Sequence, residues 1–310
     1  MNAPLIVVAG PTGSGKSGLA VELARSFGGE VVNCDSVQVY RGLNIGAAKL
    51  PLAERQEVPH HLIDVVEVSD LFTAGEFLSL GRAMLQEIRA RNRLPIVAGG
   101  TGLYLRALLQ GLFEGPKRSE PLRARLCQLA DRKGAAHLHQ ILKRVDAPSA
   151  AKVSPNDKPK TIRALEVFFL TSVPISQQFL KGRHALGGFE VLKIGLSPPR
   201  KLLYEFIDQR VEQMFSQGLL DEVQSLFARG FAPDLKPLQS LGYAQTIRHL
   251  KGELGLREAI SETQQETRRY AKRQLTWFRK EKDMIWFDGF GSDTSVRRAV
   301  KQRVREFIKS

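Results

Sequence analysis

The residues most able to do chemistry lie at positions 10–17, which have the sequence GPTGSGKS. This stretch, called the P-loop below, matches the phosphate-binding pattern G-x-x-x-x-G-K-[ST] and follows a strand-like apolar run, LIVVA. Its glycines would let backbone N–H groups point at phosphate oxygens, and the N-terminus of the following helix adds partial positive charge. Lys16 would neutralise the phosphates and the Ser17 hydroxyl would bind Mg²⁺. The motif predicts a site for a di- or triphosphate, and alone it is typical of ATP binding.

Enzymes that hydrolyse nucleotides at such a loop usually have a second apolar strand that ends in an acid, which holds Mg²⁺ or its water. Here the apolar run LPIVA is followed by GGTG, so that acid is absent. The segment LIDVVE carries Asp64 and Glu67, but it matches such a strand poorly. The sequence therefore predicts a phosphate site without clear machinery for hydrolysis.

Asp35 and Thr101 follow two other apolar runs, EVVNC and LPIVAGG. A side chain at the carboxyl end of a parallel strand points into the crevice where such sheets bind ligands. Asp35 could act as a Mg²⁺ ligand, as a general base, or as a helix cap beside Ser36. Thr101 could offer its hydroxyl to a phosphate or cap the helix that follows. The residue pattern alone leaves these alternatives open.

Residues 267–280, TRRYAKRQLTWFRK, have helical spacing. One face of this helix would carry Arg269, Arg273, Thr276 and Lys280, with aromatic side chains beside them. Cations next to aromatic rings suit a phosphate backbone and unstacked bases, as in RNA binding. A core helix with a solvated basic face is the alternative.

Histidine and cysteine residues give no metal site. In the histidine pair at 60–61, neighbouring side chains of an extended segment would point to opposite faces, so a structural role is expected. The pair at 137 and 139 has no cysteine or acid at ligand spacing. Cys34 and Cys127 form no C-x-x-C pattern, which favours reduced thiols.

The elements that must position these residues alternate between strands and helices over the first 110 residues, which is typical of a parallel α/β sheet. Further strands are expected at 189–196 and near Trp286. In the first part, strands are expected at 5–9, 30–35, 62–67 and 94–102, and helices at 16–27, 75–93 and from 103. Later helices are expected at 199–217, 219–229, 256–280 and from 296.

Residues 111–185 lack strand signals and contain short helical segments broken by prolines. We therefore expect two parts: a P-loop-type α/β core with C-terminal helices, formed by 1–110 and 186–310, and an inserted, basic, all-helical subdomain at 111–185.

Charge follows this division. The chain of 310 residues has a net charge of +14, and Lys+Arg exceed Asp+Glu by 14 to 6 in residues 111–185 and by 15 to 9 in 251–310, while the other parts are balanced. Two basic regions beside a neutral body suggest a polyanionic partner, although solubility alone could explain them. No apolar run approaches the roughly 20 residues of a membrane span, and no secretory signal is evident, so we expect a cytoplasmic protein without a membrane partner.

Taken in order, several segments resemble the tRNA dimethylallyltransferase (tRNA isopentenyltransferase) family. The segments are GPTGSGKS, DSVQVYRGLNIG, PHHLID, PIVAGGTGLY, SPND with IRALEV, QGLLDEV, LGY and TRRYAKRQLTWFR. The chain has no C-terminal extension rich in cysteine and histidine, so it resembles the bacterial type. The family transfers a dimethylallyl group from dimethylallyl diphosphate to the exocyclic N6 amine of the adenine on the 3′ side of the anticodon.

The resemblance implies roles for particular residues. Asp35 would be the general base, and Thr101 and Arg210 would stabilise the leaving diphosphate together with the P-loop and Mg²⁺ bound by Ser17. Phe206 stands where the family often has arginine, which leaves Arg210 as the better phosphate ligand. The P-loop residues expected to bind the diphosphate are Gly10, Pro11, Thr12, Gly13, Ser14, Gly15, Lys16 and Ser17.

The resemblance also implies which residues bind the anticodon stem-loop and its target nucleotide. They are Asp35, Ser36, Val37, Gln38, Thr101, Arg123, Pro159, Lys160, Thr161, Ile162, Arg163, Gln239, Ser240, Leu241, Gly242, Tyr243, Ala244, Lys272, Arg273, Gln274, Leu275, Thr276, Trp277, Phe278 and Arg279. We expect the protein to act as a monomer.

Three other functions remain as alternatives. An adenylate isopentenyltransferase would do the same chemistry on free AMP or ATP, but it would not need the basic insert. A small-molecule P-loop kinase predicts ATP turnover without RNA affinity. A non-catalytic RNA-binding protein with a nucleotide switch predicts that Asp35 is dispensable.

Overall fold

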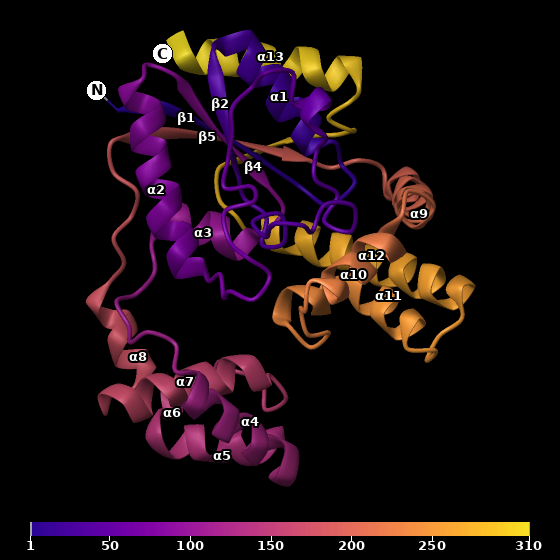
Figure 1. The fold of residues 1–310 in the computed structure, drawn as a ribbon. Helices are drawn as coiled ribbons and strands as arrows, with labels where there is room; N and C mark the ends of the chain where they lie inside the picture. The colour runs from indigo at the N-terminus through magenta and orange to yellow at the C-terminus, as the bar shows by residue number, and fades with distance from the viewer. Residues whose placement is uncertain (1, 310) are drawn as a thin grey trace. The chain divides into compact units, whose positions relative to one another are not determined.

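The computed structural model describes residues 2–309, apart from the side chain of Lys181 (Figure 1). The chain forms two compact units, Met1–Leu109 with Leu186–Ser310, and Gln110–Ala185. The first unit is an α/β core, and the second consists of helices.

Within the described residues, the core contains a six-stranded sheet with the order β3-β2-β4-β1-β5-β6. Neighbouring strands are parallel throughout, so all of them end at one edge, where open parallel sheets bind ligands. The predicted parallel α/β sheet is confirmed. Its strands are β1 Ala3–Ala9, β2 Gly29–Asn33, β3 His60–His61, β4 Leu94–Gly99, β5 Phe189–Leu196 and β6 Met284–Phe287.

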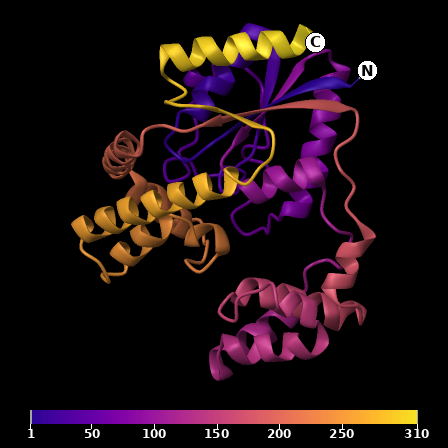
Figure 2. The ribbon, with the colours of Figure 1, turned by 180° about the vertical axis from the view of Figure 1, so that it is seen from behind.

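Helices cover both faces of the sheet, as Figures 1 and 2 show from opposite sides. They are α1 Lys16–Phe27 and α13 Thr294–Lys309 on one face, and α2 Ala74–Ala90 and α3 Gly102–Gln110 on the other. Alternate residues of β1 reach the two faces. Ile6 packs in a cluster with Leu19 of α1, whereas Leu5 packs in a second cluster with Phe77 of α2. Burial on both faces explains why the strands are apolar runs.

Four further helices follow β5. They are α9 Arg200–Ser216, α10 Leu219–Ala228, α11 Tyr243–Leu250 and α12 Leu256–Phe278. The long helix α12 packs against α9 and α11, and α10 packs against α9 and α11. The expected positions of α9, α10 and α12 are confirmed, while α11, which begins at the LGY motif, was not among the predicted helices.

The prediction of a strand at 62–67 is wrong. The strand ends at His61 because Leu62 and Asp64 have φ values of 60° and 56°, which an extended chain cannot contain. Val66 forms only an isolated parallel bridge with Tyr40. Asn33 compensates for the early end of the ladder by donating a hydrogen bond to the Leu62 carbonyl. The LID segment is therefore a turn held by side chains.

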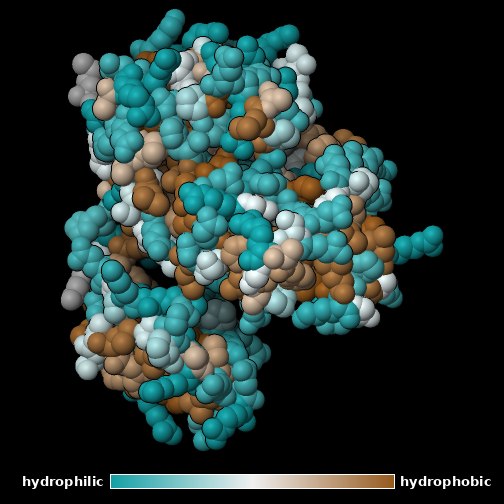
Figure 3. All heavy atoms as spheres, viewed as in Figure 1, coloured by the Kyte–Doolittle hydropathy of each residue, from teal (hydrophilic) through white to brown (hydrophobic). Residues whose placement is uncertain are grey.

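Helix α13 has valines at every fourth position facing the sheet, and these are Val296, Val300 and Val304. Figure 3 shows hydrophilic residues over most of the upper part of the view, where this helix lies. The predicted C-terminal helix is confirmed, and the structure shows that it is amphipathic. Among the described residues, no helix is long and apolar enough to cross a membrane.

The unit Gln110–Ala185 has an apolar core of its own, centred on Leu138, Leu142 and Leu165. Its helices are α4 Glu120–Lys133, α5 Ala135–Val145, α6 Ala147–Ala150, α7 Lys158–Thr171 and α8 Ile175–Gln178. Prolines stand in the first turns of α4, α6 and α7, where a missing N–H costs nothing. Prolines 148 and 159 therefore lie in the first turns of helices in this unit and do not interrupt them.

Glu166, in α7, is fully buried although it is charged. Its Oε1 accepts hydrogen bonds from the Ser119 amide (2.8 Å) and Arg123 Nε (3.0 Å), and its Oε2 accepts one from Arg163 Nη1 (2.6 Å). Burial by itself would raise the pKa of Glu166, but these hydrogen bonds together hold it below the ordinary value. The carboxylate thus ties α7 to α4 through the Ser119 amide and the Arg123 guanidinium, while Arg163, from α7 itself, adds a second cation.

We predict that Glu166→Gln lowers the thermal unfolding midpoint at neutral pH, because a neutral amide cannot compensate the charges of two partly buried guanidiniums. Since the folded pKa is depressed, the stabilisation is present above the ordinary value of 4.5 and is lost as pH falls through the lower folded pKa. Circular dichroism melts of both proteins between about pH 3 and pH 7 measure this. Glu114→Gln, an exposed change in the same unit, is the control. A midpoint difference that persists unchanged at the lowest pH would contradict the prediction.

Candidate active site

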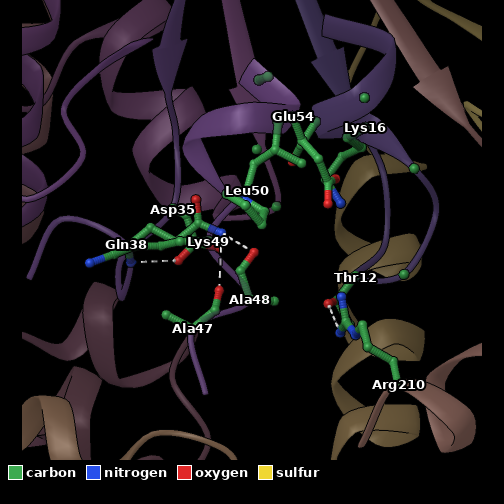
Figure 4. Close-up of a pocket in the computed structure, with 18 of the residues that line it drawn as sticks. Thr12, Lys16, Asp35, Gln38, Ala47, Ala48, Lys49, Leu50, Glu54 and Arg210 are labelled. Carbon is green, nitrogen blue, oxygen red and sulfur yellow. Dashed lines mark hydrogen bonds between the residues drawn. The ribbon is translucent and has the colours of Figure 1, made fainter. Parts of the chain in front are cut away.

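A cavity of about 930 Å³ lies at the carboxyl ends of β1, β2 and β4. The P-loop forms one side of it, and the segment after β2 forms another. Figure 4 shows Lys16 and Arg210 across the cavity from Asp35. Cationic and anionic groups therefore face the same space.

The P-loop connects β1 to α1 and is held from outside by the C-terminal part of the chain. Gly15 caps α1 with a φ of 82°, and a Cβ at this position would lie 3.0 Å from the Gly291 amide nitrogen. That amide donates a hydrogen bond to the Ser14 carbonyl at 2.8 Å. Only glycine suits both the backbone conformation and this close approach.

Lys16 and Ser17 stand at the start of α1 and line the cavity. The Lys16 ammonium donates a hydrogen bond to the Pro11 carbonyl at 2.6 Å. Burial lowers the pKa of Lys16 to about 7, with Asp35 acting in the opposite direction and Arg210 in the same direction. A bound polyanion would favour the protonated form. Ser17 is exposed, so its hydroxyl is accessible to a ligand.

Arg210 reaches the P-loop from α9, where its Nη2 donates to Thr12 Oγ1 at 2.7 Å. Among the described residues, its buried Nε has no hydrogen-bond partner. Burial lowers the pKa of Arg210, and the charge of Asp35 partly opposes this. A buried N–H without a partner costs free energy, so this donor is suited to an anionic ligand in the cavity.

Gln274 of α12 joins the P-loop to the end of β4. Its Oε1 accepts from the Thr12 amide at 2.7 Å, and its Nε2 donates to the Gly100 carbonyl at 2.8 Å. A Cβ on Gly100 would lie 2.2 Å from this Nε2, and one on Gly99 would lie 2.0 Å from the Cys34 carbonyl oxygen. The absence of an acid at this strand end thus has a steric reason: a side chain at Gly99 would overlap backbone, and one at Gly100 would displace the Gln274 amide from its hydrogen bonds.

Asp35 caps the turn that follows β2 with one oxygen. Its Oδ1 accepts from the amides of Val37 (2.8 Å) and Gln38 (3.2 Å), while Oδ2 has no hydrogen-bond partner among the described residues. Both capping and a chemical role are therefore open to the same carboxylate. Thr101 Oγ1 accepts a hydrogen bond from the Ser36 amide at 3.1 Å. It joins the ends of β2 and β4 beside Asp35.

Cations gather on one surface of α12, around a second cavity of about 520 Å³. Its lining residues are Arg106, Arg269, Lys272, Arg273, Thr276, Trp277 and Lys280. The predicted polar face of this helix is confirmed as one continuous surface, which we call the basic groove. Arg106 of α3 was not predicted; its guanidinium lies 4.3 Å from the Trp277 ring centroid. No local sequence pattern marks it, because only the packing of α3 against α12 brings it there.

In the α12 segment that the resemblance assigns to tRNA binding, some side chains are exposed and others are buried. Lys272, Arg273, Thr276 and Arg279 are exposed, whereas Gln274 and Phe278 are buried. The buried side chains hold the helix against the core, so only the exposed ones offer side-chain surface to a partner.

In the helical unit, Pro159 and Lys160 are exposed, whereas Thr161 and Ile162 are buried and offer no side-chain surface to a partner. Arg123 and Arg163 are the two guanidiniums bound to Glu166. Partial exposure of both leaves part of their donor capacity toward solvent.

In the segment 239–244, Gln239 is exposed, and Ser240, Leu241 and Ala244 are partly exposed. Gly242 and Tyr243 are buried, and the Tyr243 side chain points into the core. The family resemblance could not separate the exposed positions of this segment from the buried ones.

His60 and His61 have different partners, as the alternation of side chains in an extended segment predicts. His60 Nδ1 lies 2.8 Å from the Val58 carbonyl oxygen, and His61 Nε2 lies 2.7 Å from Glu30 Oε2. Their contacts are structural.

Comparison with known proteins gives consistent matches over nearly the whole chain. A family model described as IPP transferase matches residues 38–281. The chain is 54% identical over 305 residues to a tRNA dimethylallyltransferase of Solibacter usitatus, covering 98% of this chain and 99% of that protein. It is 50% identical to a tRNA dimethylallyltransferase of Koribacter versatilis, covering 96% of each.

Two solved structures also resemble this fold. The full-length tRNA isopentenylpyrophosphate transferase of Bacillus halodurans matches with a TM-score of 0.73 and 37% identity, covering 99% of this chain and 97% of that one. A eukaryotic dimethylallyltransferase acting on tRNA matches with a TM-score of 0.84 and 28% identity, covering 99% and 80%.

We predict that Gly99→Ala destabilises the protein by about 3 kcal/mol, because a methyl group here overlaps a backbone carbonyl that cannot move freely. Gly18→Ala is the matched control, since a Cβ at that helical position has no heavy atom within 4 Å. It should be neutral or slightly stabilising. Urea unfolding of both variants measures the free energies. A Gly99→Ala protein as stable as the wild type would show that side chains are not sterically excluded from this strand end.

Proposed function

This chain belongs to the IPP transferase family, and we propose that its P-loop cavity binds dimethylallyl diphosphate opposite the base Asp35. The chain is an enzyme that prenylates tRNA, and its alternatives as a kinase or an adenylate isopentenyltransferase are not favoured. The observation that carries the proposal is the placement of Asp35 across one cavity from Lys16 and Arg210.

The donor diphosphate would lie on the P-loop side of the cavity. Lys16 and the buried Nε of Arg210 are cationic donors available to phosphate oxygens, and the amides at the start of α1 add to them. Negative charge develops on the bridging oxygen as the allylic C–O bond breaks, so donors already fixed in place lower the barrier. We therefore propose that the loop binds the diphosphate of an isoprenoid donor in place of ATP.

The donor set fits a magnesium ion held mainly by the substrate. Ser17 offers an accessible hydroxyl, and no group of three or more His, Cys, Asp or Glu side chains within residues 2–309 could hold a metal alone. Mg²⁺ commonly takes one or two protein ligands and completes its shell with phosphate oxygens and water. Bound beside Ser17, it would neutralise charge on the leaving diphosphate.

Asp35 would accept the proton of the attacking amine. An adenine amine is a weak nucleophile, because its lone pair is delocalised into the ring. As this pair forms the N–C bond, the C–O pair leaves with the diphosphate and the amine loses one proton, which Asp35 Oδ2 can take. Oδ1 stays bound to the amides of Val37 and Gln38, so the carboxylate keeps its orientation. Thr101 would support this geometry through Ser36.

The acceptor would be the adenine on the 3′ side of the anticodon, flipped into the cavity. The basic groove and the excess of cations in the helical unit support this, since phosphates are neutralised by Lys and Arg. One chain supplies both the phosphate loop and Asp35, so we propose that a monomer suffices and that it acts in the cytoplasm on tRNA.

We predict that the purified protein with Mg²⁺ and labelled dimethylallyl diphosphate labels unmodified tRNA and does not label AMP. Filter binding of the tRNA and chromatography of the nucleosides measure the product and its position. Transfer to AMP without transfer to tRNA would refute the proposed acceptor.

Asp35→Asn should reduce the transfer rate by about 10²-fold, because the amide keeps the turn but accepts no proton. The tRNA dissociation constant should stay within about twofold, since the variant leaves the basic groove intact. Asp234→Asn, an exposed change of the same kind, should behave as the wild type. Single-turnover rates measure the effect, and an undiminished rate would remove Asp35 from the mechanism.

A further inference from the structure

Two motifs, QGLLDEV and LGY, carry the family resemblance without supplying any group to the chemistry above. In the structure they meet around one carboxylate, that of Glu222 in the first turn of α10. Glu222 Oε2 accepts hydrogen bonds from the amides of Asn44 (3.0 Å) and Ile45 (2.8 Å), and Oε1 accepts from the amide of Gly46 (3.2 Å). Three successive amides on one carboxylate make a strong, charge-assisted anchor for this loop.

Tyr243 completes the anchor from α11. Its side chain is fully buried, and its hydroxyl donates to Glu222 Oε1 at 2.6 Å while accepting from the Ala47 amide at 3.2 Å. Burial and the neighbouring carboxylate raise the pKa of Tyr243, so the hydroxyl keeps its proton. A Cβ on Gly46 would lie 2.6 Å from the tyrosine ring. The ring and the carboxylate together fix residues 44–47 on the wall of the cavity.

The same loop fixes the amide group of Gln38. Gln38 Nε2 donates to the carbonyls of Ala47 (3.0 Å) and Ala48 (3.2 Å), as the dashed lines in Figure 4 show. Because both carbonyls are acceptors, the atom of the Gln38 side chain that faces them must be the NH₂ nitrogen. The orientation of the amide is therefore determined. Its Oε1 is then an acceptor, and no hydrogen bond to it is present among the described residues. The Gln38 backbone amide also donates to Asp35 Oδ1.

We propose that Glu222 and Tyr243 are positioning residues, which act through the loop 44–48 to orient the side-chain amide of Gln38 beside Asp35. This rests on the proposed function, in which an exocyclic amine enters the cavity. Such an amine has two N–H groups: one donates to Gln38 Oε1, and the other loses its proton to Asp35. A carbonyl in place of the amine would face two acceptors, so the arrangement selects for a donor. Tyr243 itself touches no RNA, because it is buried.

The test is a double-mutant cycle between the anchor and Gln38. Glu222→Gln places an NH₂ group against amide donors, and Tyr243→Phe removes the bridging hydroxyl while keeping the packed ring. Each should lower kcat by about tenfold to a hundredfold, the range expected when reacting groups are displaced by about 1 Å. The KM for dimethylallyl diphosphate and the tRNA dissociation constant should stay within about twofold. Asp221→Asn, which removes an exposed charge from the same turn of α10, is the matched control.

The cycle distinguishes positioning from general stability. In a Gln38→Leu background, Glu222→Gln and Tyr243→Phe should cost little further activity, because the pathway through Gln38 is already lost. Losses that multiply would overturn the proposal, as would a loss of tRNA affinity in place of kcat. If Glu222→Gln does not fold, the cycle with Tyr243→Phe decides.

A second readout is independent of activity. The side-chain amide NMR resonances of Gln38 should move in both anchor variants and stay in place in Asp221→Asn. Gln38 amide resonances that do not move in the two anchor variants would overturn the proposal, whatever the transfer activity of those variants. A wild-type protein that labels no tRNA would instead refute the proposed function, and the resonances would still report on the anchor.

Discussion

The site depends on the contact between the Gln274 side chain and two backbone groups, the Thr12 amide and the Gly100 carbonyl. The Thr12 amide lies in the loop after β1, and the Gly100 carbonyl lies just after β4. The buried side-chain amide of Gln274 forms a hydrogen bond with each of them. The contact also brings α12 over the carboxyl edge of the strands. Because α9 packs on α12, Arg210 then reaches Thr12. One face of α12 thus lines the P-loop cavity through Tyr270 and Gln274, while the adjacent cationic face forms the basic groove.

Much of the fold could be predicted because its signals are local. The glycines, Lys16 and the apolar run before them define the P-loop within a dozen residues, and the spacing of α12 defines its polar face. Leu62 and Asp64 could not be predicted, since nothing in LIDVVE shows that these residues have positive φ values. That conformation is imposed from elsewhere, by the hydrogen bond from Asn33 and by the pairing of Lys49 with Asp64.

The candidate site likewise contains features that could be predicted from the sequence and features that could not. Asp35 could be selected by its place after a strand, but its two roles could not be separated, and the structure assigns capping to Oδ1 and leaves Oδ2 accessible. Glu222 lies 175 or more residues from the amides that it binds, and Arg106 reaches Trp277 through tertiary packing. Local sequence patterns give no signal for contacts between residues that lie so far apart along the chain. Glu166 shows that composition can also overestimate the number of free charges. Its carboxylate pairs with two arginines that composition alone would count as free cations.

A P-loop normally suggests hydrolysis, and the structure gives a physical reason that supports our proposal of transfer at this loop. At the end of β4, Gly99 has no room for a side chain because it meets the Cys34 backbone, and a side chain at Gly100 would displace the Gln274 amide. Among the described residues that line the cavity, Asp35 is the carboxylate that closely follows β2, and its Oδ1 is bound to the Gln38 amide across the cavity from Lys16. In the proposed mechanism, Asp35 would act on a nucleophile that enters from the side of the cavity away from the P-loop. The loop would then keep its role toward phosphate, while the residues after β2 would determine what attacks.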